Sequence, residues 1–174
     1  MKKLTYYFFP VFILSLLNLF ISGCSGKSDN EYLQIGNKDV TAKQYNEAAK
    51  SYQDLLDKHP DSKLAPEALF KLASLYHGNV LKGISHQESL KKAVKLYGEV
   101  YDKYPDSPRA STALFIKGFI LANDLNDYAE AKEAYTLFLK KYPDNQLVPS
   151  VKEELNNLGV PPDEILKGKT AKPT

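Results

Sequence analysis

The stretch Ala48 to Ser62 reads AAKSYQDLLDKHPDS, and it returns twice without gaps, as AVKLYGEVYDKYPDS at 93–107 and as AKEAYTLFLKKYPDN at 131–145. Each copy begins with Ala, has Tyr four residues later and has Pro twelve residues after the Ala. A pattern that returns after a few tens of residues indicates a repeat architecture, in which each copy forms the same supersecondary unit.

Each copy predicts a helix that ends at its proline and a second helix that follows. Ala48, Tyr52 and Leu55 lie at helical spacing on one face. Pro60 lacks an N–H and disfavours helical geometry in the residue before it, so the helix should stop there. Ser62 is then expected to cap the next helix. The other copies carry Pro105 and Pro143, followed by Ser107 and Asn145 as the expected N-caps.

The helices expected after these caps cover 64–76, 109–122 and 147–158. The last has apolar residues on one side only, which suits a helix that covers the end of a stack, and Gly159 should end it. The capping-box pattern marks three upstream starts, at Thr41-x-x-Gln44, Ser85-x-x-Glu88 and Asp127-x-x-Glu130. Most of the extra length of the middle unit falls in 77–85, where we expect an extended loop.

The spacing of Ala, Tyr and Pro resembles that of the tetratricopeptide repeat, in which these residues belong to the second helix of each unit. The resemblance covers about Thr41 to Gly159. It implies an all-α fold of helix-turn-helix repeats that form a short right-handed superhelical solenoid and bind other proteins. The chain departs from the family in having no Trp and in carrying Asn156 where the last unit should have Gly or Ala. The first unit also lacks a full leading helix before Thr41.

The first residues predict an export signal. Lys2 and Lys3 precede an uncharged apolar run over 4–21, and Ser22-Gly23-Cys24 follows. Residues 21–24 resemble a bacterial lipobox, which implies cleavage before Cys24 and lipid attachment to its thiol. The alternative is a plain signal peptide or an uncleaved anchor with an incidental cysteine. We therefore expect a signal peptide at 1–23, a flexible tether at 24–40, the repeat domain at 41–159 and a polar tail at 160–174.

Together, the lipobox and the Tyr-Pro-Asp-Ser phrase are similar to those of outer-membrane assembly lipoproteins and of the periplasmic repeat proteins of the Tol-Pal system. This resemblance implies a lipid-anchored protein of the cell envelope, at the outer membrane and facing the periplasm.

Charge and motif content argue against several function classes. Without Lys2 and Lys3 the chain has 21 basic and 21 acidic residues, so it lacks the positive charge that binding to nucleic acid requires. Cys24 is the only cysteine, which leaves no disulfide framework. His77 and His86 flank the expected loop without nearby carboxylates and make a poor metal site. No catalytic or phosphate-binding motif occurs, so we expect no enzyme activity, no cofactor and no metal.

A stack of helix pairs offers a concave face lined by the first helix of each pair. Phe70, Phe115 and Phe119 are the expected partner anchors on this face, because buried aromatic side chains dominate interface energetics. Ser74 and His77 are further candidates for partner contact. The alternative for Phe70 and Phe115 is ordinary packing between repeats. Aligning the units places these residues on the face: Glu67, Phe70, Ser74, His77, Thr112, Phe115, Phe119 and Ala122.

The favoured function is therefore that of an adaptor that organises envelope proteins or peptides, in outer-membrane biogenesis or cell division. A self-associating or peptidoglycan-binding structural protein is the alternative. An envelope hydrolase or metal carrier would need a site that the sequence does not contain.

Overall fold

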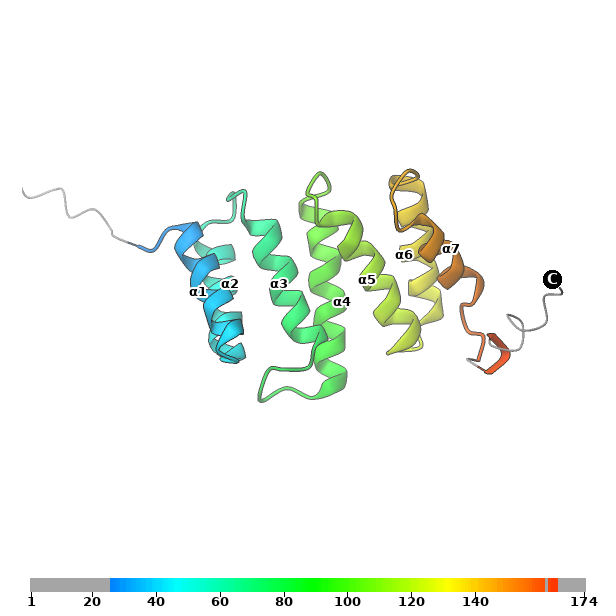
Figure 1. Cartoon of the computed structure of the whole chain (residues 1–174), viewed down its shortest axis with the longest axis horizontal. Coiled ribbons are helices and arrows are strands. Elements are labelled where there is room, and N and C mark those ends of the chain that lie inside the picture. The colour runs from blue at the N-terminus through cyan, green and yellow to red at the C-terminus, as the bar shows by residue number, and fades with distance from the viewer. Residues whose placement is uncertain (1–25, 162, 166–174) are drawn as a thin grey trace, which may run out of the picture.

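The computed structural model describes residues 26–161 and 163–165, and its helices form pairs that follow one another in a row from one end of the molecule to the other (Figure 1). The predicted signal peptide, Cys24 and most of the predicted tail lie outside the described residues. The helices within them are α1 (Asp29–Thr41), α2 (Tyr45–Lys58), α3 (Ala65–His77), α4 (His86–Lys103), α5 (Ala110–Asn123), α6 (Tyr128–Lys141) and α7 (Val148–Asn156).

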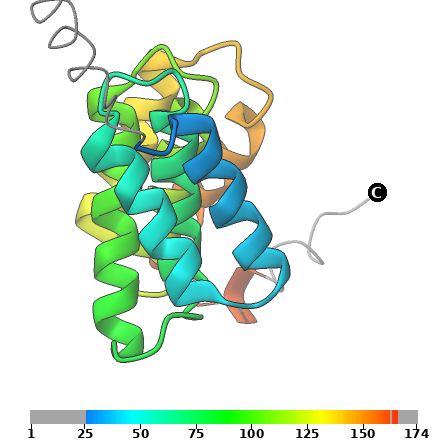
Figure 2. The same ribbon diagram turned by 90° about the vertical axis from the view of Figure 1, so that its left-hand side faces the viewer.

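Each helix packs mainly against its neighbours in sequence. This arrangement produces the pairs α1–α2, α3–α4 and α5–α6, and α7 covers α6 at the far end. Figure 2 views the row from its α1 end, where α1 and α2 lie side by side. Contacts between α3 and α5 link the first helices of two successive pairs. The predicted all-α stack of paired helices is confirmed.

The recurring alanines and tyrosines form the core between the helices. Ala48, Ala93 and Ala131 have no exposed surface, and the tyrosines four residues later are equally buried. The small Ala lets a neighbouring helix approach closely, while each tyrosine ring fills the space beside it. Gly36 in α1 makes the same kind of room, since a Cβ there would lie 2.4 Å from the ring of Tyr52.

The helix that follows each proline is present, but the predicted N-caps Ser62, Ser107 and Asn145 are wrong, because the N-caps are Leu64, Arg109 and Leu147. Ser62 Oγ accepts a hydrogen bond at 2.9 Å from the N–H of Leu64, the residue just before the helix, and so supports the turn instead of capping the helix. The Ala65 N–H then bonds to the Ser62 carbonyl, which makes the first turn tighter than an α-helix and places the regular start at Ala65. Ser107 and Asn145 make the equivalent bonds to Arg109 and Leu147.

The prediction of a flexible tether at 24–40 is wrong for residues 29–40, which belong to α1. Ser28 and Glu31 form a reciprocal capping box at its start, and Tyr32 is buried against the next helix. The first repeat therefore has its full leading helix. The polar composition of this segment hid the helix, because only Tyr32 and Gly36 are buried. The pattern Ser28-x-x-Glu31 was the signal that could have located it.

Of the three predicted capping boxes, the one at Ser85 and Glu88 is present with both hydrogen bonds. Asp127 caps α6 by accepting from the Glu130 N–H. The box at Thr41 is wrong, because Thr41 ends α1 and α2 begins after Gln44 without a side-chain cap.

The predicted extended loop is also present, and it connects α3 to α4. It is held to the start of α2 through the backbone of Lys82, whose N–H donates to Asn46 Oδ1 at 3.1 Å.

Candidate functional site

A groove of about 560 Å³ lies between α1 and α3 and reaches the start of α5. We call it the α1–α3 groove. It combines an apolar wall with charged and hydroxyl-bearing side chains, and polar groups of this kind orient a bound ligand in an apolar site. Its lining residues are Asn37, Val40, Thr41, Tyr52, Glu67, Phe70, Lys71, Ser74, Leu75 and Arg109.

Arg109 links α5 to α3 across this groove. Its guanidinium donates to both carboxylate oxygens of Glu67, with Nη2 at 3.0 Å from Oε1, and lies 4.9 Å from the ring centre of Phe70. Lys71 Nζ lies 3.5 Å from the same carboxylate. Burial acts to raise the pKa of Glu67, but the bonds and charges of Arg109 and Lys71 outweigh it and lower the pKa. Two cations therefore face one carboxylate, so the charged side chains that line the groove have a net positive charge.

Tyrosine hydroxyls from the second helices reach the first helices at this face. Tyr52 Oη donates to Asn37 Oδ1 at 2.9 Å, and Tyr97 Oη lies 3.0 Å from Ser74 Oγ. Burial raises the pKa of Tyr52 to about 12, with Glu67 as a second cause. Phe70 packs edge-on against Tyr97 at 5.3 Å between ring centres. These contacts hold the groove's polar groups in fixed positions.

The third repeat breaks this pattern. Phe119 stands where the earlier repeats have Asn37 and Ser74, so the equivalent tyrosine, Tyr135, meets no side-chain acceptor there. Within the described residues its buried hydroxyl has no hydrogen-bond partner. Burial raises the pKa of Tyr135, and the nearby Glu154 carboxylate adds to the effect.

The structure brings only some of the sequence-predicted contact residues together. Phe70 and Ser74 both line the α1–α3 groove. His77 lies apart from that lining, and its Nε2 is 3.8 Å from the Asp124 carboxylate, so the prediction that His77 has no carboxylate nearby is wrong. Phe115 and Phe119 form a separate pair on α5, with ring centres 6.4 Å apart.

The predicted contact residues also differ in how deeply they are buried. Phe70 and Phe115 are half-buried and pack against the core clusters, so the packing alternative also describes them. Phe119 is half-buried but belongs to neither cluster. Ala122 is buried, so its predicted place on the open face is wrong.

Sequence reasoning missed much of the groove. Asn37 and Val40 were hidden because α1 was interpreted as a tether, although alignment of α1 with α3 would have placed them on the same face. Lys71 and Arg109 belong to no sequence motif that predicts binding. Arg109 reaches Glu67 only because α5 packs beside α3.

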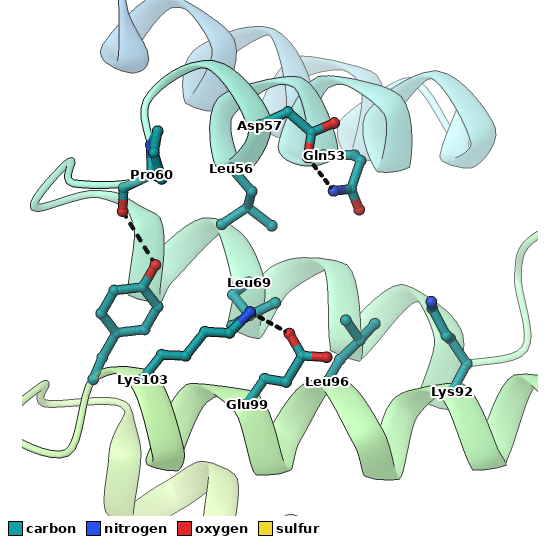
Figure 3. Close-up of a pocket in the computed structure, with 10 residues that line it drawn as sticks. Gln53, Leu56, Asp57, Pro60, Leu69, Lys92, Leu96, Glu99 and Lys103 are labelled. Atoms are coloured by element: carbon teal, nitrogen blue, oxygen red, sulfur yellow. Dashed lines mark hydrogen bonds and ion pairs between the residues drawn. The ribbon is translucent and has the colours of Figure 1, made fainter.

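A second groove of about 400 Å³ lies between α2 and α4, and we call it the α2–α4 groove (Figure 3). Its apolar floor is formed by Leu56, Leu69 and Leu96. At one end Tyr104 Oη donates to the Pro60 carbonyl at 3.3 Å, which closes the groove. Its rim is formed by Gln53, Asp57, Lys92, Glu99 and Lys103.

Among residues 26–161 and 163–165, no three or more His, Cys, Asp or Glu side chains are grouped to hold a metal ion. None of the helices in this part of the chain has the length and apolar character needed to cross a bilayer.

The sequence model of the tetratricopeptide repeat matches the chain three times, at residues 32–62, 67–107 and 112–145. Together these matches cover more than half of the chain, and each match corresponds to one helix pair. The first begins inside α1, in agreement with α1 as the leading helix of the first repeat. No curated protein matches the chain in sequence.

Proposed function

Because this chain belongs to the tetratricopeptide-repeat family, we propose that it is a lipid-anchored adaptor of the bacterial cell envelope, which binds partner proteins through the α1–α3 groove. The repeats themselves identify it as a scaffold for protein–protein interaction, of a family that is typically non-enzymatic. The location in the envelope, the lipid anchor and the use of the α1–α3 groove are proposals that go beyond the family match.

The observation that carries the proposal is the composition of the α1–α3 groove. It offers the half-buried ring of Phe70 beside the exposed guanidinium of Arg109, and aromatic and Arg side chains are the types that dominate binding energy at interfaces. Asn37 and Ser74 are held by tyrosine hydroxyls, so little side-chain entropy is lost when a partner binds. A groove with fixed polar groups and one apolar wall suits an extended partner segment.

The envelope setting is supported by Cys24 at the end of the apolar run. Three residues separate Cys24 from the N-cap Ser28, which allows a span of about 14 Å at most. Lipidation at Cys24 would hold the α1 end of the row close to the bilayer. We place the protein at the outer membrane, facing the periplasm, in outer-membrane biogenesis or cell division.

The two ends of the row favour an adaptor over a self-associating structural protein. Lys152 and Glu153 on α7 are exposed, as are Gln34 and Lys38 on α1. Within the described residues, the large exposed apolar side chains are Tyr128 at 42% and Val160 at 37%. Stable self-association needs a larger apolar patch than these two supply.

Photo-crosslinking in cells tests this proposal. p-Benzoylphenylalanine is placed at Lys71 in the groove and, as a matched control, at the exposed Lys132 on α6. We expect envelope proteins to be captured from Lys71 and not from Lys132, with mass spectrometry finding a lipid on Cys24. Capture of only a second copy of the chain, or of peptidoglycan, from Lys71 would contradict the adaptor function. An intact Met1 or an unmodified Cys24 would contradict the anchor.

A further inference from the structure

The α2–α4 groove marks a position at which the first two repeats differ. Aligning 48–62 with 93–107 places Leu56 opposite Tyr101. In the second repeat the ring of Tyr101 packs edge-on against Tyr142, with ring centres 6.5 Å apart. Tyr142 in turn donates to the Pro105 carbonyl at 3.4 Å.

The first repeat has the same closing bond but lacks the packed ring. Tyr104 is the counterpart of Tyr142, and it donates to Pro60 as Tyr142 donates to Pro105. Leu56 has a shorter side chain than Tyr101 and leaves the space beside Tyr104 open. The part of the α2–α4 groove beside Tyr104 is therefore the place that an aromatic ring at position 56 would occupy, while Leu96, which stands where the next repeat has Ala134, fills part of the remaining space.

The floor of this space is apolar. Leu69 and Leu96 are buried at 3% and 5% exposure, and Leu56 is half-buried on the α2 side of the groove. Figure 3 shows the three leucines between the rims of α2 and α4. An aromatic side chain laid on this floor would remove the exposed part of Leu56 from water, which favours binding.

The rim of the groove carries two acidic and two basic side chains, which have different partners. Lys103 Nζ is paired with Glu99 at 2.7 Å, and Asp57 accepts from the Gln53 amide at 2.8 Å. Lys92 lies at the end away from Pro60 and has no ion pair within the described residues (Figure 3). A carboxylate on the occupant would be complementary to Lys92.

We propose that the α2–α4 groove is a second binding site, which receives an aromatic side chain of a partner protein with a carboxylate next to it. The partner's ring takes the place that Tyr101 fills in the following repeat, and its carboxylate meets Lys92. This site is formed by the second helices of two repeats together with Leu69 of α3, and it is separate from the α1–α3 groove. It adds a second surface to the adaptor and does not depend on the lipid anchor.

Methyl NMR of the full chain in detergent micelles tests this site with defined probes. The probes are the capped tripeptides Glu-Tyr-Glu, Glu-Ala-Glu and Lys-Tyr-Lys. We expect Glu-Tyr-Glu to shift the methyl signals of Leu56, Leu69 and Leu96 in a saturable way. Glu-Ala-Glu should leave these signals unchanged, and Lys-Tyr-Lys should bind about tenfold more weakly.

Two substitutions and a matched control isolate the groove. Leu56→Tyr fills the space from within and should weaken Glu-Tyr-Glu binding at least about tenfold. Leu139→Tyr makes the same change at the equivalent position of the third repeat and should leave binding unaltered. Lys92→Glu is a surface change that should remove the preference for Glu-Tyr-Glu over Lys-Tyr-Lys without altering the helical circular dichroism.

The site would be overturned by shifts at Val40 and Leu75 instead, because these residues line the α1–α3 groove. Unchanged binding in a folded Leu56→Tyr variant would overturn it as well. Neither result bears on partner capture from Lys71, so failure of this site and failure of the proposed function are distinguishable.

Discussion

The ring of Tyr135 lies directly against the backbone of Gly118, so closely that a Cβ at position 118 would stand 2.6 Å from Cε1 of the ring. Gly118→Ala should therefore destabilise the fold, by about 1–3 kcal/mol, because the buried ring must move away from α5. Urea unfolding followed by circular dichroism measures the change.

Gly98→Ala is the matched control for this substitution. Gly98 also lies within a helix, but the nearest atom to a Cβ there is Lys117 Nζ at 3.6 Å, an ordinary contact with a flexible side chain. Its replacement should stabilise by about 0.5–1 kcal/mol, since Ala favours the helix. Equal effects of the two substitutions would show that the ring of Tyr135 adapts freely.

The three equivalent tyrosines should respond differently to loss of the hydroxyl. Tyr52→Phe and Tyr97→Phe each remove a hydrogen bond and should cost about 1 kcal/mol. Tyr135→Phe removes a buried hydroxyl without a partner in the described residues, so it should be neutral or stabilising.

Chemical unfolding of the three single variants makes this comparison, with Phe119→Asn as a fourth. Asn at position 119 reproduces the place of Asn37 and should make Tyr135→Phe costly in its background. A cost for Tyr135→Phe in the unaltered chain would instead reveal a bond to Glu154.

Acid should weaken the link between α3 and α5. The pKa of Glu67 is lowered below its ordinary value of 4.5 in the folded chain. A lowered pKa means that this stabilisation is present above pH 4.5 and is lost as the pH falls through the folded value. The midpoint of urea unfolding should therefore fall more steeply below pH 4.5 in the unaltered chain than in Glu67→Gln. Parallel pH profiles would exclude a stabilising Arg109–Glu67 pair.

Residues 32–41 should resist hydrogen exchange as the other helices do, because α1 packs on α2 and is not a tether. Ser28→Ala removes the N-cap and should cost about 1 kcal/mol, with faster exchange at the start of α1. Thr41→Ala is the control, since Thr41 donates to the Asn37 carbonyl and caps no helix. Rapid exchange throughout 32–41 would restore the tether interpretation.

Helix ends and core positions were predictable because their causes are local. Pro60, Pro105 and Pro143 end helices through their own missing N–H, whatever packs nearby. Ser85 and Glu88 meet within a single turn, so their spacing alone predicted the cap. The prediction of a tether at residues 29–40 failed because the cause of that helix is not local. The ring of Tyr52, sixteen residues beyond Gly36, packs on α1, whose own composition is polar.

The sequence by itself determined the repeat, the pairing of helices beyond the first repeat and the identity of the buried alanines and tyrosines, since each follows from periodicity within one unit. Only the tertiary structure decided where the open surfaces lie. The α1–α3 groove needs Arg109 from the following repeat to reach Glu67, and the α2–α4 groove is lined by residues of α2, α3 and α4 together. Such surfaces depend on distances between residues far apart in the chain, and those distances are set by how successive helices pack.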